Sequence, residues 1–156
     1  ATTDGKIYIW ENNPSAIATV LTNAPTSNQG VLVTDERFVM CLGAGGNPRK
    51  VQWSSQEAAT VWTPASTNSA GSLEVASDGK IRAGIVVRGQ VLILTDTSAH
   101  ALSFVGTPFY YVQETAGSNC GIISAKAVAV TGTAAFWMGE KSFFRYDGGS
   151  DPQRCQ

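Results

Sequence analysis

The sequence predicts an all-β fold made of repeated antiparallel sheets, and three observations support this prediction. Two apolar runs rich in β-branched residues flank the pair Arg88-Gly89, which is typical of a β-hairpin. The same pattern occurs around turn pairs that begin at Asp35 and Thr131. The turn pairs therefore start at positions 35, 88 and 131, with offsets of 53 and 43 residues. These offsets lie near the ~40–50-residue period of propeller blades, so we expect blade-like sheets that form part of a β-propeller.

The chain opens with a predicted strand over 6–10, where Ile7 and Ile9 alternate with aromatic residues. A second strand is expected over 16–22. The run 6–10 resembles the run 141–146 at the end of the third repeat, and it is interpreted as the last strand of a blade. We therefore expect a partial blade over about 1–29, in a chain that is a fragment of a longer propeller protein.

The first complete blade is expected over about 30–72. After its hairpin, the segment 43–50 contains glycines that permit positive φ and a proline that prevents pairing, so a protruding loop is predicted. Ser54 and Glu57 have capping-box spacing, which predicts one short helical turn before Trp62. The polar segment 63–72 is expected to be a connector.

The second and third blades are expected over about 73–116 and 117–156, so that 1–156 forms a single β-repeat domain. The central hairpin lies in the second blade, and its run 91–94 is apolar at every position, which indicates a strand covered on both faces. Further strands are predicted over 101–105 and 109–112. The glycine-containing segment 115–121 is predicted to be a loop.

Composition argues against several classes of function. The net charge of −1 gives the whole domain no strong attraction to nucleic acid or membranes. No run approaches the ~18 apolar residues of a membrane-spanning segment. Cys41, Cys120 and Cys155 are far apart and form no CxxC pair, so we expect unpaired thiols and no zinc. No metal and no cofactor are predicted.

Four segments of the repeats are distinctive: GNPRKVQWSSQE at 46–57, TVWTP at 60–64, GSNCG at 117–121 and AFWMGEKSFFRYDGG at 135–149. Together, in order and spacing, they resemble a β-propeller family of tailed-bacteriophage tail proteins, of the hub, nozzle or packaged-DNA-stabilisation type. The resemblance covers about 30–155, whereas members of that family are usually several times longer. It implies a structural virion protein that forms oligomeric rings around the DNA channel. The implied partners are other tail proteins, further copies of this chain and packaged DNA in non-specific proximity.

His100 is the only histidine, and Asp96, Thr97 and Ser98 lie close to it in the sequence. A Ser/His/Asp triad must converge from separate elements, so these four residues are interpreted as ordinary loop residues. Cys120 lies in GSNCG, which is not the GxSxG pattern of a nucleophile elbow. We interpret it as part of a turn with a partly buried thiol.

The remaining patterns do not indicate an enzyme. A glycosidase would need two carboxylates about 5–10 Å apart, whereas those of this chain lie scattered, mostly at turns: Glu36, Glu57, Glu74, Asp78, Asp96 and Glu114. The Ser77-Asp78-Gly79 segment lacks the spacing and the trailing tryptophan of a sialidase Asp-box. The segment 43–48 lacks the third glycine of GxGxxG. We therefore predict no catalytic and no cofactor-binding residues.

The tryptophans leave an alternative function open, a carbohydrate- or receptor-binding propeller module. Trp10, Trp53, Trp62 and Trp137 could stack on a ligand or pack between blades. Core packing is favoured for Trp137, whereas both interpretations stay open for Trp62. The main basic residues could face DNA or an acidic partner, although solvated turn charges are the default interpretation: Arg49, Lys50, Lys80, Arg82 and Arg88.

Overall fold

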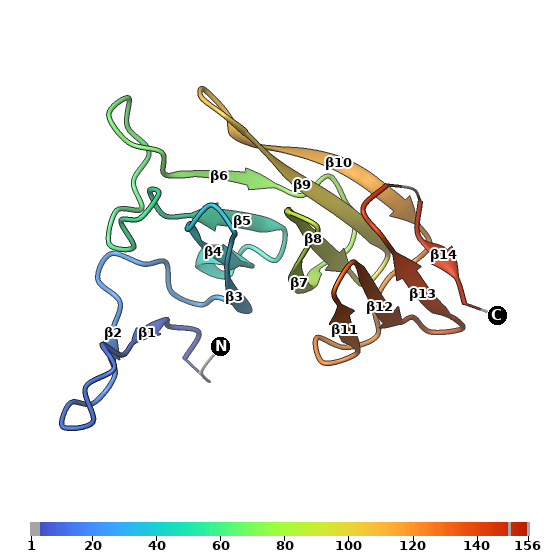
Figure 1. Cartoon of the computed structure of the whole chain (residues 1–156), viewed down its shortest axis with the longest axis horizontal. Helices are drawn as coiled ribbons and strands as arrows, with labels where there is room; N and C mark the ends of the chain where they lie inside the picture. Colours follow the sequence, from blue (N-terminus) through green and yellow to red (C-terminus); the bar gives the residue numbers. More distant parts are fainter. Residues whose placement is uncertain (1–3, 150, 156) are drawn as a thin grey trace. The chain divides into compact units, whose positions relative to one another are not determined.

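The computed structural model describes residues 4–149 and 151–155, and the chain divides into two compact units, Ala1–Leu73 and Glu74–Gln156 (Figure 1). The outermost residues of the predicted domain, 1–3 and 156, lie outside the described part. The described strands form four small antiparallel sheets, none of them closed, and the one helix described is a short 3-10 turn. The all-β prediction is therefore confirmed. No helix in the described part is long and apolar enough to cross a membrane.

The first unit contains a two-stranded sheet and a four-stranded meander. The two-stranded sheet pairs β1 (Tyr8–Ile9) with β2 (Thr19–Val20). The meander follows chain order through β3 (Gly30–Val33), β4 (Val39–Leu42), β5 (Lys50–Trp53) and β6 (Gly71–Glu74). The turn between β3 and β4 lies at Asp35-Glu36, as predicted. It is closed by the Thr34 N–H, which donates to the Phe38 carbonyl at 3.0 Å.

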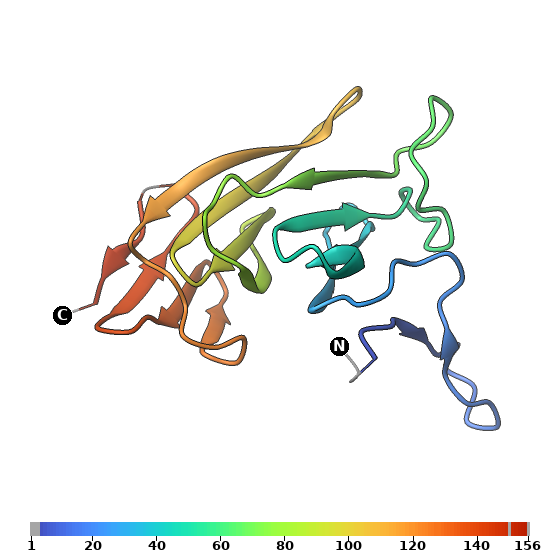
Figure 2. The ribbon, with the colours of Figure 1, turned by 180° about the vertical axis from the view of Figure 1, so that it is seen from behind.

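The second unit contains two more four-stranded meanders (Figures 1 and 2). The first consists of β7 (Ile81–Val87), β8 (Gln90–Thr95), β9 (Ser98–Gly106) and β10 (Tyr110–Ser118). The second consists of β11 (Val128–Thr131), β12 (Ala134–Met138), β13 (Phe143–Tyr146) and β14 (Gln153–Arg154). The three predicted hairpins thus lie in three separate sheets. The third turn is Gly132-Thr133, one residue later than predicted.

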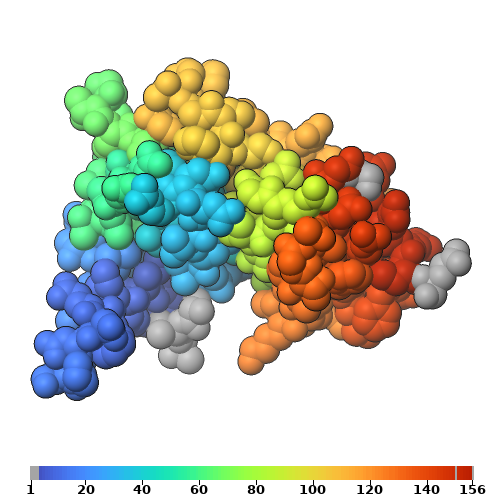
Figure 3. All heavy atoms as spheres, in the orientation of Figure 1, coloured from blue at the N-terminus to red at the C-terminus, as the bar shows by residue number. Residues whose placement is uncertain are grey.

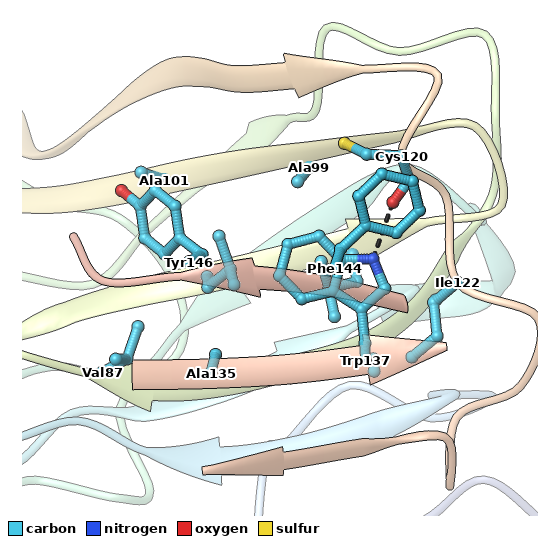
Figure 4. Packing of buried hydrophobic residues seen from close by; sticks show 12 residues of the cluster. Val87, Ala99, Ala101, Cys120, Ile122, Ala135, Trp137, Phe144 and Tyr146 are labelled. Atoms are coloured by element: carbon cyan, nitrogen blue, oxygen red, sulfur yellow. Dashed lines mark hydrogen bonds between the residues drawn. The ribbon is translucent and has the colours of Figure 1, made fainter. Parts of the chain in front are cut away.

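Strand β8 is buried on both faces, as its continuous apolar run predicts. Val91, Leu92, Ile93 and Leu94 are all at most 2% exposed. Leu92 and Leu94 belong to the main core of the second unit, which Trp137 of β12 also joins. The Trp137 ring stacks on Phe144 at 5.7 Å, and its indole N–H donates to the Cys120 carbonyl at 2.7 Å (Figure 4). This core joins residues of the β7–β10 and β11–β14 sheets.

The core of the first unit corrects the prediction of a protruding loop over 43–50 and decides between the two interpretations left open for Trp62. Ala44 is 1% exposed and packs with Cys41 and Trp62, so the segment 43–50 begins in the core, and its exposed part starts only at Gly45. Trp62 is itself 3% exposed, and its indole N–H donates to the Ala59 carbonyl at 2.6 Å. Because its ring is buried and its indole N–H is satisfied by a backbone carbonyl, Trp62 is a core residue.

The predicted helical turn at 54–57 is also wrong. The Ser54 hydroxyl accepts a hydrogen bond from the Val39 N–H at 3.1 Å, so it serves a neighbouring strand and caps no helix. Glu57 has φ of +56°, which is incompatible with a continuing right-handed helix. The side chain of Glu57 instead forms an ion pair with Arg37. Tertiary contacts therefore override the local capping signal.

Candidate functional site

A cluster of hydroxyl groups surrounds the turn between β8 and β9 in the second unit. We use the name hydroxyl cluster for the side chains of Ser77, Thr95, Thr97, Ser98 and His100. The Ser77 hydroxyl lies 2.8 Å from that of Ser98, and 3.2 Å from those of Thr95 and Thr97. Thr95 accepts the Ser98 N–H at 2.8 Å. The cluster therefore ties the segment before β7 to the turn that follows β8.

His100 lies at one end of this cluster, in contact with Ser98, and the prediction that it lies in a loop is wrong. It is 1% exposed within β9, two residues after Ser98, so strand alternation places both side chains on one face. Its Nε2 lies 2.8 Å from the Ser98 hydroxyl, and its Nδ1 lies 3.4 Å from the Thr115 hydroxyl. The predicted loop at 115–121 is likewise wrong in its first half, because β10 continues to Ser118.

The Ser98–His100 pair does not form a hydrolytic triad. Asp96 is turned to other partners: its Oδ1 accepts the Lys80 N–H at 2.8 Å, and its Oδ2 accepts from the Arg82 guanidinium at 3.3 Å. A hydroxyl group, that of Thr115, stands at the ring nitrogen where a triad has its carboxylate. Ser98 is also 8% exposed, which leaves its hydroxyl little access to a substrate. We interpret the pair as structural.

Because His100 is buried, the stability of the fold is expected to depend on pH. Burial lowers the pKa of His100 below its usual 6.5, so the unfolded chain binds more protons than the folded one below that value. The free energy of unfolding should therefore fall as the pH decreases below about 6.5, by at most about 1.4 kcal/mol for each pH unit. Urea unfolding at pH 7.5 and pH 5 should show a larger loss for the wild type than for His100→Gln. Equal losses would contradict this assignment.

A polar cavity of about 440 Å³ opens beside the hydroxyl cluster within the second unit. Its walls come from the β8–β9 turn, the β10–β11 loop, the β12–β13 turn and the end of the chain: Asp96, Thr97, Asn119, Gly121, Glu140, Lys141, Ser142, Phe144 and Arg154. The Arg154 guanidinium lies over the Phe144 ring, 6.0 Å from its centre, and covers the aromatic wall. Its lining contains two acidic residues, Asp96 and Glu140, and two basic residues, Lys141 and Arg154. The cavity therefore favours neither an anionic nor a cationic ligand.

The three thiols are free, and two of them are buried. Burial raises the pKa of Cys41 to about 12 and also raises the pKa of Cys120, so both are protonated thiols at neutral pH. A protonated thiol is a poor nucleophile and a poor metal ligand. Among the described residues, no group of three or more His, Cys, Asp or Glu side chains is placed to hold a metal ion.

Two of the basic candidates and one further tryptophan make side-chain contacts within their own unit. Arg82 pairs with Asp96 at 3.3 Å, and Arg88 donates to the Asp147 carbonyl at 3.0 Å. The Trp53 indole N–H donates to the Ser69 carbonyl at 3.0 Å, so this ring is also anchored in the core. In comparisons with known proteins, no family model matches the chain, and no curated protein matches it.

Proposed function

We propose that this chain is a structural component of a bacteriophage tail, and that its sheets are blades of a β-propeller completed by association with further strands. The resemblance described above supplies the tail assignment. The structural observation that supports it is the incomplete sheet of the first unit. In this proposal the protein is located in the virion, next to other tail proteins around the DNA channel.

The incomplete sheet is apolar and exposed. We use the name β1–β2 patch for its apolar side chains: Tyr8, Ile9, Trp10, Ile17 and Val20, which are 43%, 40%, 50%, 87% and 46% exposed. Tyr8 and Val20 are paired across the two strands. The Trp10 indole N–H donates to the Ala16 carbonyl at 3.0 Å, which holds Trp10 beside the loop that carries Ile17. Tyr8 and Val20 therefore share one face of the sheet, whereas Ile9 points to the other, so exposed apolar side chains lie on both faces.

The two-stranded sheet of β1 and β2 is expected to pair with strands of another chain. An isolated two-stranded sheet is marginal in water, and its open edges offer unpaired backbone groups to another chain. Exposed apolar side chains gathered on one small sheet are typical of an interaction site. The other three sheets have four strands each, which suggests that two further strands complete the β1–β2 sheet.

The alternative, a carbohydrate-binding module with repeated aromatic pockets, has less support. Three of the four tryptophans are at most 3% exposed, and each donates its indole N–H to a backbone carbonyl: Trp53, Trp62 and Trp137. Sugar stacking requires an accessible aromatic face. The charge-balanced cavity offers only Phe144, which is 6% exposed. The proposed role therefore rests on assembly and not on ligand recognition.

Self-association is tested by light scattering on the purified full chain after size exclusion. We expect a discrete particle heavier than the 16.4 kDa monomer. Ile17→Asp should shift it toward the monomer, because a charge on the β1–β2 patch must be desolvated on association. Ser66→Asp adds the same charge to an exposed loop of the same unit and should leave the mass unchanged. A monomeric wild type, or equal effects of both variants, would refute the proposal.

A further inference from the structure

One face of the β11–β14 sheet is apolar and exposed. Phe136 pairs with Arg145 across β12 and β13, and Met138 pairs with Phe143, so these four side chains share one face. We use the name β12–β13 face for the four of them. Phe136, Met138 and Phe143 are 36%, 40% and 58% exposed. Atoms of this sheet, in orange to red, form part of the surface visible in Figure 3.

The opposite face of the same two strands is core. Ala135, Trp137, Phe144 and Tyr146 alternate with the residues of the β12–β13 face and are at most 6% exposed. They belong to the main core of the second unit, where they pack with residues of the β7–β10 sheet (Figure 4). Strand β12 is therefore apolar toward both sides, whereas only one of its faces is buried among the described residues.

The second strands of the other two four-stranded sheets have the same apolar pattern, and both of their faces are buried. In β8, the consecutive residues 91–94 are at most 2% exposed. In β4, the consecutive residues Met40, Cys41 and Leu42 are at most 3% exposed. Since neighbouring residues of a strand point to opposite faces, β4 and β8 are covered on both sides. By the same pattern, the β12–β13 face is expected to be covered by an apolar surface of another molecule.

The β1–β2 patch matches this face in charge. The segment 127–139, which includes β11 and β12, contains no Asp, Glu, Lys or Arg, and neither does the segment 12–34, which includes Ile17 and β2. An interface between these two segments buries no unpaired charge, whereas a charged partner surface would have to be desolvated at a cost. The charge pattern therefore favours the β1–β2 patch as the partner surface.

The area of the two surfaces is also sufficient. The apolar side chains of the β12–β13 face and those of Tyr8, Trp10, Ile17 and Val20 together expose roughly 700 Å², at about 200 Å² for a whole large side chain. Specific interfaces bury about 1,200–2,000 Å² in total. These seven side chains thus supply more than half of the smallest such interface, and a polar rim around them supplies the remainder.

We propose that the β12–β13 face of one copy of this chain packs against the β1–β2 patch of a second copy. The two surfaces differ, so the contact is head-to-tail and every copy offers one of each. Repeating the contact gives a ring where the rotation closes and a filament where it does not. This inference rests on the self-association in the proposed function, and it names the surface that the β1–β2 patch binds. The edges of β1 and β2 remain available for pairing with further strands.

Light scattering on the full chain tests the β12–β13 face with Phe143→Asp. The variant should need at least about tenfold more protein to assemble, because the new charge must be desolvated in the contact. Met138→Lys, with a charge of the opposite sign, should have the same effect. The matched control is Asn119→Asp, which adds the same charge in the β10–β11 loop. Asn119 is exposed and lines the cavity beside Phe144, whose side chain points away from the β12–β13 face, so the mass should stay unchanged.

A mixing experiment tests the head-to-tail arrangement. The Ile17→Asp chain keeps an intact β12–β13 face, and the Phe143→Asp chain keeps an intact β1–β2 patch. We expect each variant alone to be a monomer at a concentration where the wild type assembles. An equal mixture of the two should form a particle of about twice the 16.4 kDa chain mass, because one intact surface of each kind can pair.

The possible failures are distinguishable. If Ile17→Asp lowers the mass and Phe143→Asp does not, the chain associates through another surface, so this inference fails and the proposed function stands. Dimers of either variant alone would show that a surface pairs with itself, and a mixture that stays monomeric would also overturn the head-to-tail contact. A monomeric wild type would overturn both proposals. Far-UV circular dichroism of each variant confirms folding, which is expected because Phe143, Met138 and Ile17 are exposed.

Discussion

Trp137→Ala is expected to lower the free energy of unfolding of the second unit by about 3–5 kcal/mol. The side chain is 1% exposed, so its removal leaves a large cavity between the two sheets of that unit. The change also removes the stacking partner of Phe144 and the donor to the Cys120 carbonyl. Urea unfolding followed by circular dichroism measures the loss, which is a large share of a typical domain stability of about 5–15 kcal/mol.

Trp137→Phe separates the two contributions. Phenylalanine keeps an aromatic ring against Phe144 but has no N–H for the Cys120 carbonyl. We expect a loss of about 1–3 kcal/mol, smaller than that of the alanine variant. Equal losses for the two variants would show that the hydrogen bond, and not ring packing, dominates at this position.

Gly121→Ala is expected to cost about 3 kcal/mol, although it adds a single methyl group. An added Cβ would lie 2.1 Å from the Asp96 carbonyl oxygen and 2.5 Å from the Thr97 nitrogen. These are backbone atoms and cannot rotate away as a side-chain end can. The neighbouring Ile122 N–H donates to the Thr95 carbonyl at 2.9 Å, so the clash also strains the bond that holds the β10–β11 loop to β8.

Gly149→Ala is the matched control, because no atom lies within 4 Å of a Cβ added there. Calorimetric melting should show a clear decrease in melting temperature for Gly121→Ala and a change within about 0.5 kcal/mol for Gly149→Ala. A Gly121→Ala chain as stable as the control would mean that the close approach to Asp96 is not required by the fold.

The all-β class and the three hairpins could be predicted from the sequence, because strands and tight turns depend on local chemistry, although the third turn lies one residue later than predicted. The Arg88-Gly89 pair between two β-branched runs sufficed to predict the β7–β8 hairpin, and the apolar run 91–94 predicted that β8 is covered on both faces. An alternation or a continuous run of apolar residues is visible in the sequence itself and indicates a strand. Signals of this kind need no knowledge of what packs against them.

The contacts between side chains, and the burial of particular residues in the core, could not be predicted from local sequence. The pairing of His100 with Ser98 and Thr115 depends on how far β9 and β10 extend, which turn residues around 97 and 115 did not reveal. Trp62 became a core residue because Ala44 and Cys41 pack against it from elsewhere in the first unit. Ser54 caps no helix because its hydroxyl accepts a hydrogen bond from the Val39 N–H, fifteen residues earlier in the chain. In each case a partner distant in sequence outweighed a local preference of only about 1 kcal/mol.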